Sequence, residues 1–302
     1  MKKNTLSTGT RVTGMVALVA ASTLGFTLSP LKAQNVDFAP LAVKGGKASS
    51  SSFVFLDDKG TLATVVELGS DVTKASLTLE GKKVPLKFVV NDADSRIAIY
   101  QLPTGSPASQ PAAIGASLQL KPSDKVFTSA TDHSDPARVV GRVHRFQGKV
   151  LPLAVLRVNH SKAAPRPGSG VYDTDGKLVG LVRQAVYNAP NSSYCLPVEV
   201  ITRVLNDHRR NGRVGRCWIG IVMDELVAAP IVESVRPDSP AKKAGLQNGD
   251  VILSIGDQAV GDYAGVVDAF YYLVAGETKK FRVLRGTEVK ELDITPEVSP
   301  GR

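Results

Sequence analysis

The sequence predicts a mainly β chain with two folded units. Through most of the first 200 residues, short apolar runs alternate with turns rich in Gly, Asp and Pro, and helical periodicity is nearly absent. After about residue 216, strand-like runs alternate with two helical segments. A length of 302 residues suits about two domains, and 43% hydrophobic with 22% charged residues is typical of globular chains.

The first unit is predicted to be a β-sandwich or barrel. The run 52–56 precedes the turn Asp57–Gly60, and 61–66 follows it as a second strand. Further strands of this kind are predicted at 75–79, 84–90, 97–100, 125–127, 138–144, 150–158 and 177–183.

The periodicity becomes helical near residue 197. Apolar residues at helical spacing predict a helix over 198–207, with Pro197 at its start. This places a first domain at 34–208, a linker at 209–215, a second domain at 216–296 and a tail at 297–302. The second domain is predicted to hold short helices near 240–244 and 264–274, with strands at 218–223, 231–235, 251–255, 280–284 and 288–294.

Residues 1–33 are predicted to be a signal peptide. Lys2 and Lys3 precede the apolar run 12–28, and Ala33 ends a small-residue cleavage site. This predicts an exported chain, periplasmic or secreted, although an uncleaved anchor is an open alternative. Removing this segment, which holds four basic and no acidic residues, lowers the net charge from +9 to +5. Such a mild charge without a basic block gives no indication of a nucleic-acid site.

Cys195 and Cys217 are the two cysteines. An exported chain with two cysteines permits a disulfide, but the helix predicted between them carries the chain away from Cys195. This favours two free buried thiols.

The stretch 235–255 carries a specific motif. Ser239-Pro240 caps and starts a short helix, and Gly245 ends it. Leu246 then enters the core, and Gly249-Asp250 turns the chain into a buried strand. This pattern resembles the PDZ domains of bacterial serine proteases, which implies an α+β fold with a partly open β-barrel and two helices.

The resemblance also implies a peptide-binding groove. Its carboxylate-binding loop falls on Trp218-Ile219-Gly220-Ile221, and a bound peptide adds as a strand along Ile221-Val222. The expected pocket walls are Val267, Phe270 and Tyr271, although core packing is an open alternative for at least one aromatic residue of this segment.

The first unit is similar to the trypsin-like domain of the HtrA/Deg family over residues 50–205. The motifs that carry the similarity are the hairpin at 51–64, the strand at 91–99 and the hairpin at 171–181. The similarity implies a trypsin-like double β-barrel, followed here by the PDZ domain.

The positions that match the family's catalytic triad hold other residues. Val66 stands at the histidine position, Arg96 at the aspartate position and Pro167 at the serine position. A serine protease needs a hydroxyl, an imidazole base and a carboxylate, and these three residues supply none of them. Pro167 also lacks the N–H group that an oxyanion hole requires, and Pro165 stiffens the same loop.

One alternative keeps the chain active. A small gap in the alignment would place Ser169, between two glycines, at the nucleophile position. It would still need a base, and the histidines do not stand where the family has one; we interpret them as surface residues: His133, His144, His160 and His208. The sequence has no clustered metal-ligand spacing, phosphate-binding loop or dinucleotide motif, so no cofactor is predicted.

Three functions are compatible with these residues. The first is a non-catalytic scaffold, chaperone-like or regulatory protein that binds peptides or C-termini of exported proteins through the PDZ domain. The second is an active endopeptidase that uses Ser169. The third is an assembly subunit that pairs with an active relative or with itself, because active members of the family commonly form trimers.

Overall fold

The computed structural model describes residues 35–299 except 43–44, 80, 107–109 and 130. The predicted signal peptide lies outside the described residues. Within the described part of the chain, no helix is both long and apolar enough to cross a bilayer.

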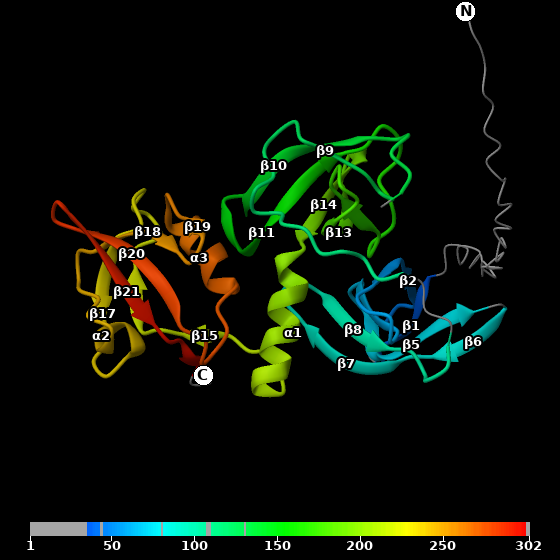
Figure 1. The fold of residues 1–302 in the computed structure, drawn as a ribbon, viewed down its shortest axis with the longest axis horizontal. Coiled ribbons are helices and arrows are strands. Elements are labelled where there is room, and N and C mark those ends of the chain that lie inside the picture. The colour runs from blue at the N-terminus through cyan, green and yellow to red at the C-terminus, as the bar shows by residue number, and fades with distance from the viewer. Residues whose placement is uncertain (1–34, 43–44, 80, 107–109, 130, 300–302) are drawn as a thin grey trace, which may run out of the picture. The chain divides into compact units, whose positions relative to one another are not determined.

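The first unit contains two consecutive β-barrel-like halves, drawn in blue to cyan and in green (Figure 1). The first half consists of two four-stranded sheets with the orders β2-β1-β5-β6 and β3-β4-β8-β7. Its strands are β1 (Val36–Pro40), β2 (Ser49–Ser51), β3 (Phe53–Phe55), β4 (Thr61–Val65), β5 (Ser70–Leu79), β6 (Lys82–Pro85), β7 (Lys87–Asp92) and β8 (Ile97–Gln101).

The second half is one six-stranded antiparallel sheet with the order β12-β13-β14-β11-β10-β9. Reciprocal backbone hydrogen bonds of 2.8 Å between Phe127 and Tyr172 join the two edges, and this closes the sheet. Its strands are β9 (Lys125–Val126), β10 (Ala137–Phe146), β11 (Lys149–Asn159), β12 (Gly170–Tyr172), β13 (Leu178–Val186) and β14 (Ala189–Pro197).

Helix α1 (Glu199–Asn211) follows the second half directly. It starts after Pro197, which belongs to β14, and ends at Gly212, whose positive φ of 71° permits a left-handed cap. The predicted linker at 209–215 is therefore wrong in its first residues, because Arg209 and Arg210 continue the helix.

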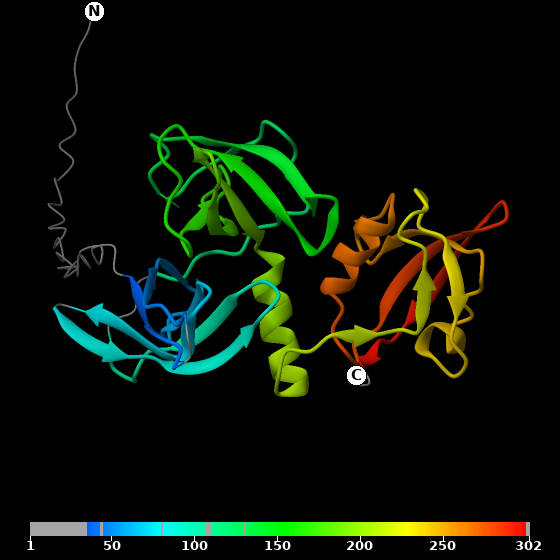
Figure 2. The same cartoon turned by 180° about the vertical axis from the view of Figure 1, so that it is seen from behind.

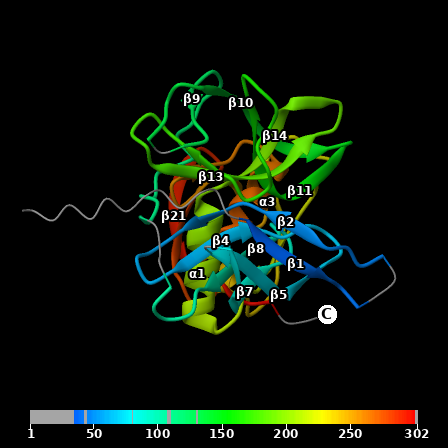
Figure 3. The same ribbon diagram turned by 90° about the vertical axis from the view of Figure 1, so that its right-hand side faces the viewer.

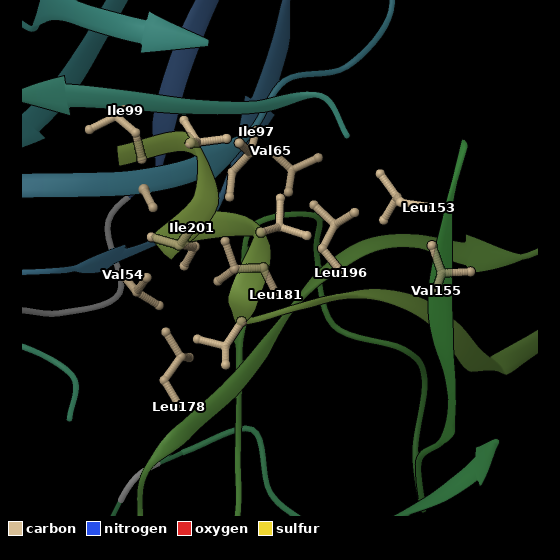
Figure 4. Packing of buried hydrophobic residues seen from close by; sticks show 14 of the residues in the cluster. Val54, Val65, Ile97, Ile99, Leu153, Val155, Leu178, Leu181, Leu196 and Ile201 are labelled. Atoms are coloured by element: carbon tan, nitrogen blue, oxygen red, sulfur yellow. The ribbon is translucent and has the colours of Figure 1, made fainter. Parts of the chain in front are cut away.

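The main core of the first unit lies between the two halves and α1. Figure 4 shows Val54 and Ile97 from the first half beside Leu181 and Leu196 from the second, with Ile201 of α1. These side chains are at most 5% exposed. Burial of this apolar surface from all three elements stabilises the unit as one body.

The C-terminal unit, drawn in yellow to red, surrounds a separate core around Leu246, Ile252 and Phe281 (Figures 1 and 2). A four-stranded sheet, β19-β18-β20-β21, and two two-stranded pairs, β16-β17 and β15-β22, form its β part. The elements are β15 (Cys217–Trp218), β16 (Ile221–Met223), β17 (Val232–Val235), α2 (Pro240–Lys243), β18 (Val251–Ile255), β19 (Gln258–Ala259), α3 (Tyr263–Tyr271), β20 (Lys279–Arg285), β21 (Glu288–Ile294) and β22 (Glu297–Val298).

The 235–255 motif folds as the sequence predicts. Ser239 Oγ accepts a hydrogen bond from the Lys242 N–H at 3.2 Å, so it caps α2, with Pro240 in the first turn. Leu246 is fully buried, and Asp250 is 1% exposed. The predicted tail at 297–302 begins instead with the short strand β22, which pairs with β15.

Helix α3 contacts β10 and β11 of the first unit. Asp268 Oδ1 accepts a hydrogen bond from the Ala154 N–H at 2.7 Å, and the Tyr271 hydroxyl donates to Asp92 Oδ2 at 2.8 Å. Asp268 is fully buried and Tyr271 is 8% exposed. The same helix that borders the core of the C-terminal unit therefore also carries the contact with the first unit.

Candidate functional sites

The three triad positions lie close to one another in the first unit. The Val66 N–H donates to the Arg96 carbonyl at 2.8 Å, which joins the end of β4 to the turn before β8. The loop that holds Pro167 packs against β4: a Cβ added at Gly168 would lie 2.9 Å from Thr64 Oγ1. The fold therefore brings the three triad positions together. They hold the apolar side chain of Val66, the cationic side chain of Arg96 and the ring of Pro167.

The loop 165–169 is held in one conformation by backbone bonds. The Ser52 N–H donates to the Pro167 carbonyl at 2.7 Å, and the Gly168 N–H donates to the Val182 carbonyl at 2.7 Å. Gly168 has φ of +82°, and a Cβ there would meet the Ser52 carbonyl oxygen at 1.8 Å. Only glycine fits this position.

The loop also lacks N–H donors for an oxyanion. In a serine protease of the trypsin type, the nucleophile's own N–H and that of the residue two positions earlier bind the oxyanion. With Pro167 at the nucleophile position, these two residues are Pro167 and Pro165, and neither has an N–H. If Ser169 were the nucleophile, the earlier residue would be Pro167, and the Ser169 N–H already donates to the Arg166 carbonyl at 3.1 Å.

No histidine forms a hydrogen bond with Ser169 within the part of the chain that the structure describes. His133 stacks on Phe127 with ring centroids 4.1 Å apart, and His144 Nε2 lies 3.8 Å from Asp268 Oδ2. His208 lies on α1, far along the chain from the loop.

His160 corrects the prediction that the histidines are all surface residues. It is 8% exposed, and its Nε2 lies 2.7 Å from the Ser193 hydroxyl. Burial lowers the pKa of His160 below its ordinary value. The ring is therefore a neutral partner of a buried serine in the barrel.

Arg96 and Arg183 form an unusual pair beside the triad positions. Arg96 has a positive φ of 66°, and its Nη2 donates to Gln184 Oε1 at 2.8 Å. Arg183 Nη2 lies 3.4 Å from the Asp94 carbonyl oxygen. Both Nε atoms are buried without a hydrogen-bond acceptor among the described residues. Burial and then the nearby Arg183 charge lower the pKa of Arg96, and burial lowers that of Arg183.

The C-terminal unit presents a loop with free donors. The carbonyls of Ile219 and Gly220 accept from Ala241 and Arg236 at 2.9 Å and 2.8 Å. Their own N–H groups donate to no acceptor in the described part of the chain. Gly220 has φ of +82°, and a Cβ there would lie 2.2 Å from the Ser239 Cβ, so the loop needs glycine.

Strand β16 continues from this loop and pairs only with β17 among the described strands, which leaves its other edge open. Ile221 is half-buried against the core of the C-terminal unit, and Val222 is 38% exposed. Trp218 pairs with Glu297 in the β15-β22 ladder. An open edge next to free N–H groups is the arrangement that an added peptide strand uses.

The three expected pocket walls on α3 have different surroundings. Val267 is half-buried. Phe270 packs edge-to-face on Phe281, 6.3 Å between centroids, so it belongs at least in part to the core. Tyr271 contacts Asp92 and the Arg203 guanidinium of the first unit, so its assignment as a groove wall is wrong.

The cysteines are free thiols in the structure. Cys195 is buried, with its Sγ 3.3 Å from the Ser193 hydroxyl, and the Cys217 thiol donates to the Leu273 carbonyl at 3.1 Å. The described residues contain no group of three or more side chains placed to hold a metal ion.

Sequence reasoning missed Arg183, Gln184 and Asp268. Arg183 stands at the end of the strand predicted at 177–183, and Asp268 stands in the helix predicted at 264–274. Neither position indicates a functional site. The weak signal for Asp268 is its place in an otherwise apolar helix, since charged residues are rarely buried unless paired.

These features define a class of protein, one that joins a trypsin-like double β-barrel to a PDZ domain. A family model for the PDZ domain matches residues 217–295. The chain superimposes on the solved structure of the HtrA-type protease AlgW with tripeptide with a TM-score of 0.60 and 20% sequence identity. The match covers 90% of this chain and 95% of that one. The structure of AlgW with decapeptide gives a TM-score of 0.58 at 18% identity, over 90% and 97%.

Curated relatives indicate the same type of protein. The chain is 25% identical over 262 residues to a probable periplasmic serine endoprotease, DegP-like, of Pseudomonas putida strain W619. The alignment covers 80% of this chain and 50% of that protein. It is 27% identical to the protein of the same description from Ectopseudomonas mendocina, over 81% and 55%. The chain spans about half the length of these relatives. It has the fold of HtrA-type proteases, with a C-terminal PDZ domain.

Proposed function

We propose that this chain is an exported, non-catalytic member of the HtrA/Deg family that binds peptides or protein C-termini through its PDZ domain. The proposal divides the chain into a leader at 1–33, a degenerate protease domain up to the end of α1 and a PDZ domain at 216–296. The described relatives are periplasmic, which supports export to that compartment.

The observation that carries the proposal is the loop with Pro165 and Pro167. Hydrolysis of a peptide bond needs a nucleophile, a base and an electrostatic partner for the oxyanion. Val66 and Arg96 supply neither the base nor its carboxylate partner, and the two prolines remove both N–H donors. The fold that surrounds these residues is retained, which fits a role in binding or scaffolding.

Peptide binding by the PDZ domain rests on a different set of residues. The free N–H groups of Ile219 and Gly220 and the open edge of β16 suit a terminal carboxylate and an added strand. The AlgW structures with a tripeptide and a decapeptide show that a protein of this fold takes peptides. The ligand class is therefore a peptide with a free C-terminus.

The first test is proteolysis. Cleavage of casein or a labelled peptide by the purified chain is compared with that of Ser169→Ala. We expect both to be inactive. Activity that disappears in Ser169→Ala would establish instead the active endopeptidase with a displaced nucleophile, and it would overturn the proposal.

The second test addresses the groove. A library of seven-residue peptides with free C-termini is screened against the purified chain. Amidation of the C-terminus should weaken the selected peptides at least about tenfold, because it removes a charge-assisted hydrogen bond. Val267→Glu should abolish binding, and Val289→Glu, at a half-exposed site on β21, should not. Equal binding of acid and amide would contradict the carboxylate-binding role of the loop.

A further inference from the structure

A second small pocket lies in the first unit, apart from the PDZ groove. It has a volume of about 160 Å³, and its walls are apolar except for two neighbouring residues of β13, Arg183 and Gln184. The apolar walls come from the β10–β11 hairpin and β14: Val143, Phe146, Leu151, Val155 and Tyr194. A cavity of about 150 Å³ holds a benzene ring, so this pocket accommodates a group of phenyl or leucine size.

The polar end of the pocket results from a β-bulge. The register between β13 and β14 shifts between Val182 and Gln184, so Arg183 is the extra residue. Consecutive strand residues normally point to opposite faces, but Arg183 and Gln184 both line the pocket. A bulge re-aims a side chain in this way, and bulges are frequent beside binding sites.

The two arginines at this end form no direct ion pair among the described residues, although the carboxylates of Glu67, Asp92 and Asp94 act on them from a greater distance. Gln184 Oε1 is bound by Arg96, which brings a second guanidinium to the same place. Among the described residues, no carboxylate oxygen lies within 4.0 Å of the Arg96 or Arg183 guanidinium. The hydrogen bonds of these two adjacent arginines to an amide oxygen and a carbonyl oxygen leave buried Nε donors without an acceptor among the described residues. A carboxylate from outside the chain would supply the charge-assisted acceptor that they lack.

The apolar end is also exposed where a ligand would cover it. Phe146 is 50% exposed, and its ring packs edge-to-face on Tyr194 with centroids 6.5 Å apart. A bound apolar group would remove part of this aromatic surface from water, which is favourable.

We propose that this pocket binds the carboxylate of a molecule that carries a phenyl- or leucine-sized group, with Arg183 and Arg96 holding the carboxylate. A peptide with an apolar C-terminal residue and a small hydrophobic acid share this chemistry. Gln184 fixes Arg96, and Phe146 and Tyr194 enclose the apolar group. The inference stands whether or not the chain hydrolyses peptides.

The test is calorimetric titration of the purified chain with N-acetyl-phenylalanine, its amide, and the free acid Ala-Ala-Phe. We expect the acid to bind and the amide to bind at least about tenfold more weakly, as for a lost charge-assisted hydrogen bond. The two acids are compared on the Val267→Glu chain, in which the PDZ groove is blocked. There, tighter binding of the tripeptide than of the acetylated amino acid identifies a peptide terminus as the source, and equal binding identifies a small acid.

Variants separate this pocket from the PDZ groove. Arg183→Gln should weaken the acid at least about tenfold, and Arg183→Lys less, because it keeps the charge. Phe146→Ala removes a half-exposed wall without a cost to the core, and it should weaken both acid and amide. Two matched controls should leave the affinity for N-acetyl-phenylalanine unchanged. They are Arg138→Gln, on an exposed residue of β10, and Val267→Glu, in the PDZ groove.

The inference is overturned if acid and amide bind equally, if no binding occurs at millimolar concentration, or if Val267→Glu rather than Arg183→Gln removes it. If Arg183→Gln fails to fold, two measurements still test whether this pocket binds the acid: the comparison of acid and amide on the native chain, and the effect of Phe146→Ala.

Discussion

Pro165 and Pro167 set the conditions under which the protease loop could be made functional. Replacing Val66 with His, Arg96 with Asp and Pro167 with Ser would install three triad side chains but leave Pro165 without an N–H. We expect this triple variant to lack robust peptidase activity. Adding Pro165→Gly to the triple variant should raise the rate of peptide cleavage by about 100-fold, because the loss of one oxyanion donor lowers the rate by about this factor.

The measurement is cleavage of a labelled peptide by the triple and quadruple variants, with the native chain as the background. Robust activity of the triple variant alone would contradict this interpretation of the loop.

The two thiols are expected to be inert in the folded chain. Burial raises the pKa of Cys195 to about 12 and that of Cys217 to about 11, so the reactive thiolate is scarce at pH 8. Titration with a thiol reagent at pH 8, without reductant, should detect neither cysteine until a denaturant is added. Detection of both should follow in denaturant, whereas none there would indicate a disulfide.

At the scale of elements, the turn into β18 depends on an ion pair. Asp250 accepts two hydrogen bonds of 2.8 Å from Arg285 and one of 3.0 Å from the Gln247 N–H. Burial alone would raise the pKa of Asp250, but these hydrogen bonds lower it below its ordinary value. A lowered folded pKa gives stability that is present at neutral pH and is lost as the pH falls below about 4.

Asp250→Asn should therefore lower the free energy of unfolding by about 2 kcal/mol at pH 7 and by less at pH 3. Urea unfolding at the two pH values measures this. Asp257→Asn, at an exposed residue after the same strand, is the control and should change little at either pH. A loss that is equal at pH 3 and pH 7 would exclude the ion pair as the cause.

The elements that could be predicted from sequence are those whose signals are local. Alternation and turn residues located most strands, and the Ser239-Pro240 cap and Gly245 located α2. Strand β1 was missed because its five residues end in a proline and are stabilised by pairing with β2 and β5.

The parts of the candidate sites that could not be predicted depend on distant partners. Tyr271 reads as a groove residue because it lies one position after Phe270, but its hydroxyl binds Asp92, 179 residues away in the chain. Arg183 lines the pocket beside Gln184 because of a register shift against β14, which the sequence of β13 alone does not reveal.

At the scale of the whole molecule, one carboxylate connects the two units. Asp268 Oδ1 accepts from the Ala154 N–H and Oδ2 from the Gln258 amide, each at 2.7 Å. Arg142 Nη1 lies 3.9 Å from Oδ2. The views in Figures 1 and 3 place α3 beside β11. The PDZ domain is thus stabilised partly by residues outside it.

Asp268→Ala should weaken this contact by about 3 kcal/mol, because it leaves the buried Ala154 N–H without its acceptor and the half-buried Arg142 guanidinium without its nearby carboxylate. We expect denaturant unfolding, followed by circular dichroism and by the fluorescence of Trp218, to separate into two transitions. Glu233→Gln, at an exposed residue of β17, is the matched control. Superimposable single transitions for native and Asp268→Ala chains would refute this coupling.

The prolines of the loop 165–169 also determine how many amide signals this loop gives in an NMR spectrum. An amide fingerprint spectrum reports one signal for each N–H, so residues 165–169 contribute three, from Arg166, Gly168 and Ser169. The Gly168 N–H lies in a 2.7 Å bond to the Val182 carbonyl and should exchange slowly with deuterium. The place where a protease would polarise its substrate is here a segment with few exchangeable hydrogens, and Gly168 is the amide that reports on its opening.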